Sequence, residues 1–589
     1  MTRDNDYSQS PRSERKLRAV SLVLTLVSLL FLIIKTQPGN DVNSNYGMIA
    51  SLPVTLLVGL AALVAAIVVQ SSVRHGTPFA LVQFLILLGY LWLAPAFLYP
   101  ALPFPASNHD LVFYTQWFPI IKSGHLDASV YTNQYYPISN LIAAESLQVF
   151  GVDNYEAFFL YVPFLLNVGA SIFLGLFFKN LFSASQRKYV FVCLSAFQLL
   201  NFTGVLCVYT FFSVGYIFFY FGLSVLASIG FFRIGNYRII LPALPLMIVI
   251  FIALALSHPE IPLVYLGLIA VVILGNAIIN RKWDDLIGSL KIVFLFSCII
   301  LAWMAFGAFP LLQSFGPSFL KSLTSNLLSF LYQGSVLPIS SATQAKVLLD
   351  YTKIALFSFV SCLALISLVP ALIHKHSVSR ILFLSFLSIG FVSLFVGNIQ
   401  GYGYIPRIFA YSLPFLLVLD LWTFQKPKRL TSFGIILFLI IASTAFFATN
   451  YSDLPVDRVP ATDFSASSFF DHYAPALSII GERNIYEFQQ IGFFGSNLQS
   501  LNPYYNWVWP FSRVRAYTFN DSELYSSSSL STMSFFVLGS TAAAQAEFDG
   551  GNKASAVIAE ATIDAISNPE YGVIYSSNYV VIFSNQYAE

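Results

Sequence analysis

The stretch from Arg233 to Lys282 reads RIGNYRIILPALPLMIVIFIALALSHPEIPLVYLGLIAVVILGNAIINRK. Two apolar runs, 239–257 and 261–279, flank a short polar turn, and basic residues stand at both outer ends of the stretch. Each run approaches the ~20 residues that an α-helix needs to cross the hydrocarbon core of a bilayer. The stretch therefore predicts two transmembrane helices whose basic ends share one side of a membrane and whose polar turn lies on the other.

Apolar runs of the same kind continue from Leu17 to about Phe447, and they predict a polytopic α-helical membrane protein. About thirteen transmembrane helices are expected, at 17–34, 46–70, 79–99, 155–178, 189–209, 211–232, 239–257, 261–279, 292–311, 353–373, 380–397, 407–424 and 430–448.

The basic residues of this region fall almost entirely in alternate loops between the runs. The opposite loops hold only Lys35, Lys122, Lys321, Lys346, Lys353 and Arg407. This bias predicts a cytoplasmic N-terminal tail, 1–16, because the loops that carry Lys and Arg stay in the cytoplasm. With an odd number of spans in the transmembrane domain, 17–449, the C-terminal part, 450–589, is expected outside. The predicted location is the cell membrane.

Composition supports this class and excludes others. The chain is 57% hydrophobic and only 10% charged, with a net charge of +2. No nucleic-acid partner is expected, since the basic residues stand where membrane topology requires them. The four cysteines lie within or at the ends of apolar runs without a CxxC pattern, which is typical of packing residues.

Two long external loops are predicted, 100–154 and 312–352, and loops of such length usually carry sites. The first opens with three prolines and then shows apolar residues at helical spacing around Trp117, which predicts an interfacial helix with Trp117 as its anchor. Ile138–Phe150 is expected to form a second amphipathic helix with Glu145 on its polar face. A further surface helix is expected within 317–346.

The C-terminal part differs in kind and predicts a small external α/β domain of about a hundred residues. Strands are expected at Ser534–Leu538, Gly572–Ser576 and Tyr579–Phe583, the last two as a hairpin, and a helix at Ala554–Ile566.

Ionisable groups at the outer boundary of the spans are candidates for function, because such groups are costly near a bilayer. Asp110 follows the third span. It is either a general base or metal ligand that orients an acceptor hydroxyl, or the N-cap of a helix. His109 and Tyr114 stand beside it and are expected to contact substrate. Asp127 fits a loop or cap residue better.

The polar turn between the apolar runs 239–257 and 261–279 brings an imidazole and a carboxylate together at the predicted outer surface. His258 and Glu260 could orient a bound group, or hold a divalent cation, Mg²⁺ or Mn²⁺, together with Asp110. The simpler alternative is a turn with a helix-starting glutamate that the helix dipole favours. Pro259 and Pro262 fix the turn, and we favour the functional interpretation.

Arg407 is the basic residue at the outer end of the late spans, after a glycine-rich connection that contains Tyr404. A guanidinium there suits bidentate binding of phosphate, and snorkelling to lipid headgroups is the alternative.

Together these features resemble the GT-C superfamily of integral-membrane glycosyltransferases, closest to its uncharacterised archaeal-type members. The resemblance rests on His109-Asp110-Leu-Val-Phe-Tyr114, on Tyr135-Tyr136-Pro137, on Ser257-His258-Pro259 and on the closing segment Gly572–Phe583, and it covers roughly residues 80–589. It implies transfer of a sugar from a polyprenyl-phosphate or dolichyl-phosphate donor to a glycan, lipid or protein acceptor on the outer side. It also implies that Asp110 is the catalytic base and that Arg407 holds the donor phosphate, with Tyr404, His258 and Glu260 as further substrate contacts.

The chain departs from the superfamily in two respects. The Trp-Trp-Asp motif of its oligosaccharyltransferases is replaced by Trp507-Val508-Trp509, which argues against transfer of whole glycans to asparagine, and the Asp-x-Asp pattern occurs only at Asp4-Asn5-Asp6, on the cytoplasmic side. Two other classes therefore stay open. One is a transporter or flippase for lipid-linked saccharides, and the other is a non-catalytic membrane subunit.

Overall fold

The structure is a computed structural model. It describes residues 11–33, 53–73, 76–98, 117, 120–121, 124–126, 135–150, 155–183, 186–201, 211–234, 237–280, 284–309, 344–373, 381–383, 385–387, 389, 405–423, 429–451, 478–481, 514–517, 535–539, 571–576 and 580–585.

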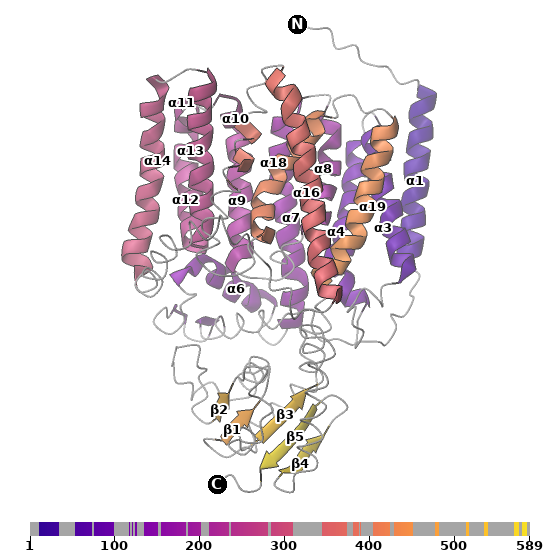
Figure 1. The fold of residues 1–589 in the computed structure, drawn as a ribbon, viewed down its shortest axis with the longest axis vertical. Coiled ribbons are helices and arrows are strands. Elements are labelled where there is room, and N and C mark those ends of the chain that lie inside the picture. Colours follow the sequence, from indigo (N-terminus) through magenta and orange to yellow (C-terminus); the bar gives the residue numbers. More distant parts are fainter. Residues whose placement is uncertain are drawn as a thin grey trace.

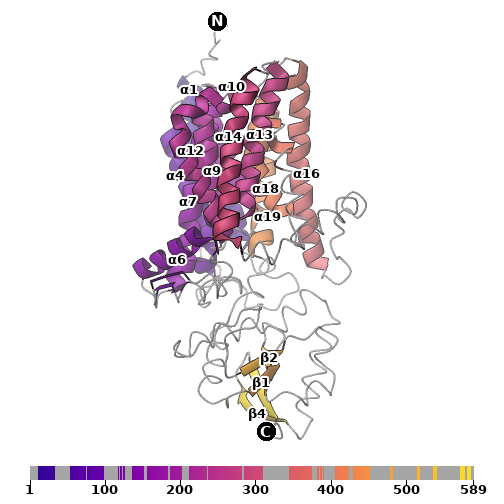
Figure 2. The same ribbon diagram turned by 90° about the vertical axis from the view of Figure 1, so that its left-hand side faces the viewer.

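The described part is a bundle of long helices, with one shorter helix across its lower end (Figures 1 and 2). The helices of eight residues or more are α1 (Pro11–Ile33), α3 (Val54–Ser71), α4 (Thr77–Leu98), α6 (Pro137–Phe150), α7 (Tyr155–Leu181), α8 (Val190–Leu199), α9 (Phe211–Ser228), α12 (Leu244–Ser257), α13 (Glu260–Asn280), α14 (Asp284–Ala302), α16 (Gln344–Ile373), α18 (Ile405–Thr423) and α19 (Arg429–Tyr451). The short elements are α10 (Phe231–Ile234), α11 (Tyr237–Ile240), the 3₁₀ turns at Arg187–Tyr189 and Leu241–Ala243, and a π-helical turn at Trp303–Gly307.

Several of these helices can cross a bilayer by length and composition. Within the described ranges there are 5 such helices, at Val54–Ser71, Tyr161–Leu181, Arg238–Ser257, Glu260–Ile278 and Gly288–Gly307. Shorter apolar helices lie at Thr77–Leu93, Ser213–Ser228, Ile354–Ile366, Phe409–Asp420 and Phe433–Phe446. The protein is thus a multi-pass helical membrane protein, and the count of about thirteen spans stays a prediction.

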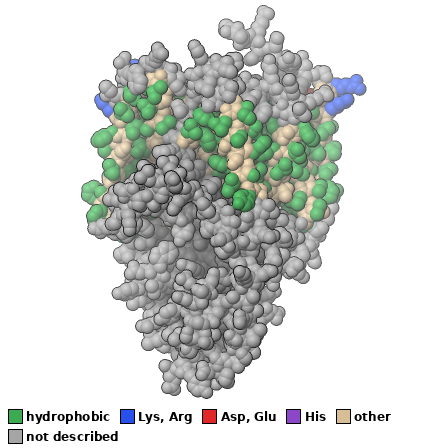
Figure 3. Space-filling view, in the orientation of Figure 1, with side chains coloured by type: hydrophobic (Ala, Val, Ile, Leu, Met, Phe, Trp, Pro, Cys, Tyr) green, Lys and Arg blue, Asp and Glu red, His purple; other side chains and the backbone are tan. Residues whose placement is uncertain are grey.

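The outer surface of the bundle suits lipid. Hydrophobic side chains form a belt over the helices, and Lys and Arg side chains lie at its upper rim (Figure 3). On α14, Phe294 and Leu301 are 71% and 62% exposed, which water would penalise and hydrocarbon would not.

Helix ends differ from the predicted spans for a physical reason. Helix α14 begins at Asp284, eight residues before the predicted start at 292, and α16 begins at Gln344, nine residues before 353. Hydropathy marks only the part of a helix that lies in lipid, and the hydrogen-bonded backbone continues beyond it. Two aspartates in the first turn of α14 also favour that early start, because carboxylates stabilise the N-terminus of a helix.

Helix α1 is built into the bundle by buried polar contacts with α3 and α4. The Ser21 hydroxyl donates to the Ala66 carbonyl at 3.1 Å, and the Gln83 amide donates to Ser21 Oγ and Thr25 Oγ1, both at 2.8 Å. Hydrogen bonds between helices hold membrane bundles together where lipid offers no alternative partner.

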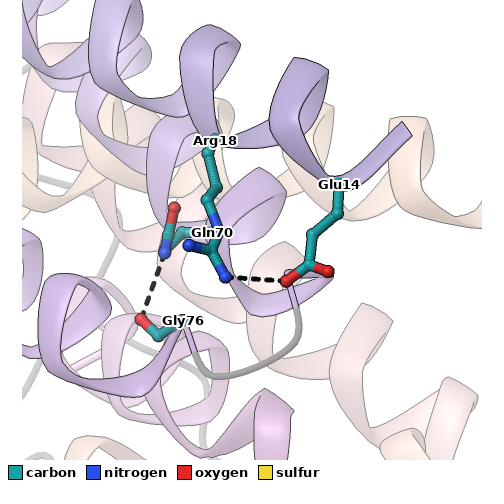
Figure 4. A network of polar contacts seen from close by, with 4 residues as sticks. All are labelled: Glu14, Arg18, Gln70 and Gly76. Atoms are coloured by element: carbon teal, nitrogen blue, oxygen red, sulfur yellow. Dashed lines mark hydrogen bonds and ion pairs between the residues drawn. The ribbon is translucent and has the colours of Figure 1, made fainter. Parts of the chain in front are cut away.

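The turn between α3 and α4 is closed by a glutamine. Gln70 Nε2 donates to the Gly76 carbonyl at 3.2 Å, next to an ion pair of 2.8 Å between Arg18 and Glu14 on α1 (Figure 4). The ion pair is exposed and adds little stability, whereas the glutamine bond is buried and fixes the turn.

Helix α9 runs through the middle of the core and packs against α7, α12 and α13. Its buried rings stack with those of neighbouring helices, as in the pair Tyr216 and Tyr411, whose ring centroids lie 4.7 Å apart. The Tyr220 hydroxyl donates to the Ala410 carbonyl at 3.1 Å, which ties α9 to α18.

Gly222 shows how closely α9 approaches α13. A Cβ atom at this position would lie 2.7 Å from Cζ of the fully buried Tyr265 ring. We expect Gly222→Ala to lower stability by about 1–3 kcal/mol through overpacking, although alanine normally favours a helix over glycine. The measurement is the midpoint of thermal unfolding in detergent, with Gly169→Ala on α7 as the matched control, because nothing lies within 4 Å of its added Cβ. A Gly222→Ala midpoint at or above that of Gly169→Ala would contradict the close approach.

The C-terminal strands form one mixed sheet in the order β2-β1-β3-β5-β4. The strands are β1 (Ser478–Gly481), β2 (Val514–Tyr517), β3 (Phe535–Gly539), β4 (Tyr571–Ser576) and β5 (Val580–Asn585). Strand β1 pairs in parallel with β2 and β3, and β5 pairs antiparallel with β3 and β4. The last three strands match the predicted ones, while β1 and β2 are four residues long, too short for an alternating pattern to stand out. The expected helix at 554–566 lies outside the described residues.

The start of α1 and the sheet lie at opposite ends of the bundle, and α6 lies at the end nearer the sheet (Figure 1).

Candidate functional site

The polar turn between α12 and α13 lies at the same end of the bundle as α6. Helix α12 ends at Ser257, and α13 begins at Glu260. His258 between them is extended, with φ −164° and ψ 144°, as expected for a residue that precedes proline. Pro259 thus ends one helix and sets the start of the next, which holds the imidazole in a defined place.

The imidazole and the carboxylate of this turn are both buried, with His258 1% and Glu260 0% exposed. The backbone N–H of Glu260 donates to Nδ1 of His258 at 3.1 Å. This bond satisfies one of the N–H groups that the first turn of a helix leaves without a backbone partner. The simpler interpretation, a turn with a helix-starting glutamate, therefore describes the local geometry correctly, although Glu260 is not a solvated surface residue.

A tyrosine from the first of the two long predicted loops, 100–154, contacts this turn. Tyr136 immediately precedes α6, which begins at Pro137, and its ring centroid lies 6.1 Å from that of His258 at an interplanar angle of 32°. Tyr136 is 7% exposed, and burial raises the pKa of its hydroxyl well above the ordinary value. The phenol is therefore neutral at physiological pH and can both donate and accept hydrogen bonds.

Trp117 fixes the position of Tyr136 through an asparagine. The indole N–H donates to Asn140 Oδ1 at 2.9 Å, and Asn140 Nδ2 donates to the Tyr136 carbonyl at 3.2 Å. Trp117 is 1% exposed and packs among Leu147 of α6 and Phe158 of α7. The prediction that Trp117 is an interfacial anchor is thus wrong, because the indole finds its partner inside the protein. The predicted helix at 138–150 is confirmed as α6, with Glu145 exposed.

The asparagine link can be tested directly. We expect Asn140→Leu to lower the midpoint of thermal unfolding, because Trp117 and Tyr136 each lose a buried hydrogen bond, at a cost of about 1–3 kcal/mol. Glu145→Gln on the exposed face of α6 is the control and should leave the midpoint unchanged. Equal midpoints for Asn140→Leu and the native protein would show that these bonds do not hold α6.

The remaining predicted site residues are not brought together by the described structure. His109, Asp110, Tyr114 and Tyr404 lie outside the described residues, and so does the surface helix expected within 317–346. The backbone of Arg407 lies in the first turn of α18, but its side chain is outside the description. Of the predicted set, His258 and Glu260 are therefore placed, and their meeting with the other groups stays a prediction.

A divalent cation is likewise not tested. No group of three or more His, Cys, Asp or Glu side chains suited to a metal occurs among the described residues. The third proposed ligand, Asp110, lies outside them.

Sequence reasoning missed two groups. Tyr136 stands in the motif Tyr135-Tyr136-Pro137, and nothing in the local sequence indicates that its ring contacts His258. Asp420 on α18 is 9% exposed, and its Oδ1 has no hydrogen-bond partner in the described part of the chain. An aspartate within the apolar run 407–424 is itself a signal of function that can be read from the sequence.

The fold and this end of the bundle together define a multi-pass helical membrane protein in which helix α6 packs beside a buried turn that holds His258 and Glu260.

Neither a family model nor a curated protein matches the chain. Among solved structures, the chain is similar to the Archaeoglobus fulgidus oligosaccharyltransferase tethered with an acceptor peptide, at 12% identity and a TM-score of 0.46, with 86% of this chain and 73% of that chain covered. It is also similar to archaeal oligosaccharyltransferase AglB from Archaeoglobus fulgidus in complex with an inhibitory peptide and a dolichol-phosphate, at 13% identity and a TM-score of 0.46, covering 86% and 74%. A third similar structure is ArnT from Cupriavidus metallidurans in the apo state, at 10% identity and a TM-score of 0.44, covering 87% and 98%. Likenesses at this level assign no activity to the chain.

Proposed function

We propose that this protein is a membrane glycosyltransferase that moves a sugar from a polyprenyl-phosphate-linked donor to an acceptor on the outer side of the membrane. The observation that carries the proposal is the meeting of Tyr136, from the first long loop, with the His258–Glu260 turn at one end of the bundle. An aromatic ring, an N–H donor and a carboxylate form a set of groups suited to a sugar, because hydroxyls both donate and accept hydrogen bonds.

The proposed topology places this end of the bundle outside. In that orientation the tail 1–16 is cytoplasmic, the C-terminal sheet is external, and the belt of exposed apolar side chains faces lipid. A lipid-linked donor reaches an outward site from within the membrane, with its chain against the apolar helix faces.

The proposed reaction is a single displacement. The acceptor hydroxyl oxygen forms a bond to the anomeric carbon while the bond from that carbon to the donor phosphate breaks. Asp110 takes the hydroxyl proton as general base, and the lipid phosphate leaves, held by Arg407. A displacement of this kind inverts the anomeric centre.

The decisive experiment is an assay of the purified full-length protein in nanodiscs. A panel of polyprenyl-phosphate hexoses is offered with saccharide, lipid and peptide acceptors, and release of lipid phosphate is followed with product formation. Release that depends on the acceptor supports the proposal. If no pair of donor and acceptor gives release of lipid phosphate, transfer from polyprenyl-phosphate hexoses to these acceptors is excluded.

A second candidate is a transporter of lipid-linked saccharide, and the buried Asp420 favours it, because ionisable groups inside membrane helices often line transport paths. The two functions separate in liposomes with a fluorescent lipid-linked sugar. Transport moves the intact lipid between leaflets without an acceptor, whereas transfer consumes it.

A further inference from the structure

Helix α1 has two sides of different character, and it stands at the edge of the bundle (Figure 1). The side that packs on the bundle holds Ser21 and Thr25, which are buried and bonded to Gln83 of α4. The other side is apolar and exposed, and we call its residues the lipid stripe: Leu22, Val23, Leu26 and Leu30. Because side chains three, four or seven residues apart share one side of a helix, these four form a continuous row along α1.

The row continues beyond the apolar span as a basic one. Helix α1 begins six residues before the predicted span at 17. Arg15 lies seven residues before Leu22 of the lipid stripe. Lys16 lies seven residues before Val23, and Arg12 lies one turn earlier. Seven residues make about two turns and about 10 Å, so these cations stand on the same side of α1 as the stripe. We call Arg12, Arg15 and Lys16 the basic cluster, and all three are exposed.

The basic cluster is not neutralised by neighbouring carboxylates. Arg18, the next cation of this helix end, pairs with Glu14 at 2.8 Å (Figure 4). Within the described ranges, the three members of the cluster form no ion pair. Lys and Arg side chains gather at the upper rim of the bundle, where α1 begins (Figures 1 and 3). The cluster therefore presents uncompensated positive charge at the boundary of the apolar belt.

We propose that this side of α1 binds an anionic phospholipid, with the headgroup phosphate at the basic cluster and an acyl chain along the lipid stripe. A headgroup with net negative charge fits better than a zwitterionic one, because each Lys or Arg near the membrane surface attracts anionic lipid. The stripe directly below the cluster selects a lipid over free phosphate, which has no apolar surface to bury there. The site lies at the opposite end of the bundle from α6, so it does not depend on the function proposed above.

The topological role of these charges does not account for their placement. The positive-inside rule depends on how many Lys and Arg residues flank a span, and it does not require them on the side of the helix that faces lipid. The observation that carries the proposal is the alignment of the basic cluster with the lipid stripe.

Native mass spectrometry of the full-length protein tests the proposal, with phosphatidylglycerol and phosphatidylcholine of equal acyl chains as probes. We expect the native protein to bind phosphatidylglycerol about tenfold more tightly. Arg15→Gln/Lys16→Gln should lose nearly all of this preference. The matched control, Arg187→Gln/Lys188→Gln, removes the same charge from the exposed turn before α8 and should keep it. Equal affinity of the native protein for both lipids, or an equal loss in both double variants, would overturn the site.

A charge exchange separates lipid binding from membrane topology. Ser13→Arg/Arg15→Ser keeps the net charge of the helix end but moves one cation about 160° around α1, away from the lipid stripe. Membrane insertion and the midpoint of thermal unfolding should stay native, and the preference for phosphatidylglycerol should fall about fivefold. An unchanged preference would show that only the number of charges matters, and the proposal would fail.

A competition arm tests the role of the lipid stripe. Glycerol phosphate, which carries the phosphate without acyl chains, should not displace phosphatidylglycerol when both are present at the same concentration. Displacement under these conditions would assign the basic cluster to free phosphate and overturn the lipid site.

Discussion

Asp110→Asn should reduce sugar transfer by about 10²- to 10⁴-fold, the contribution that a positioned general base makes to catalysis. Asparagine has nearly the same shape as aspartate, but it cannot accept the proton of the attacking hydroxyl. Membrane insertion and the midpoint of thermal unfolding should stay at the native values, and donor binding should be retained. The measurement is the initial rate of lipid-phosphate release at saturating donor and acceptor.

The matched control for this prediction is Asp127→Asn, an acid of the same outer loop for which a loop or cap role is expected. Its rate should equal the native one. Native turnover in Asp110→Asn would remove Asp110 from the catalytic role, and equal loss in both variants would point to a general effect of charge in the loop.

Arg407→Lys should lower kcat/KM for the lipid-linked donor by about 10- to 100-fold, since a hydrogen bond to a charged group contributes about 1.5–3 kcal/mol. Lysine keeps the charge but loses the planar fork that binds phosphate bidentately, so the change tests geometry and not only charge. Product inhibition by the free lipid phosphate should weaken by a similar factor.

Lys353→Gln supplies the control for Arg407, because Lys353 is another basic residue predicted on the outer side. A role for Arg407 in anchoring to lipid headgroups predicts unchanged kinetics with Arg407→Lys, because lysine snorkels equally well. Unchanged inhibition by the lipid phosphate would therefore favour the headgroup role.

The class of the fold could be predicted from the sequence because one strong physical signal, apolar length, repeats along the chain. The position of the turn at His258 could be predicted equally well, because two prolines and two long apolar runs restrict where the chain can turn. Helix ends were predicted less well, as at Asp284 and Gln344, because hydropathy reports the lipid boundary and not the end of hydrogen bonding.

Contacts between distant segments were beyond the reach of local patterns. Nothing around Trp117 indicates that its indole would be buried against Asn140, and an aromatic residue in an interfacial segment is ordinarily expected at the headgroups. The meeting of Tyr136 and His258 also depends on how the bundle closes. By contrast, the buried Asp420 could have been recognised from its sequence alone.

The bonds from Trp117 through Asn140 to Tyr136 have a mechanical consequence for the turn beneath them. Because Tyr136 links α6 to the imidazole, a displacement of α6 by headgroups or detergent should also displace the His258 ring. The lipid composition around the protein should therefore tune how the imidazole is oriented.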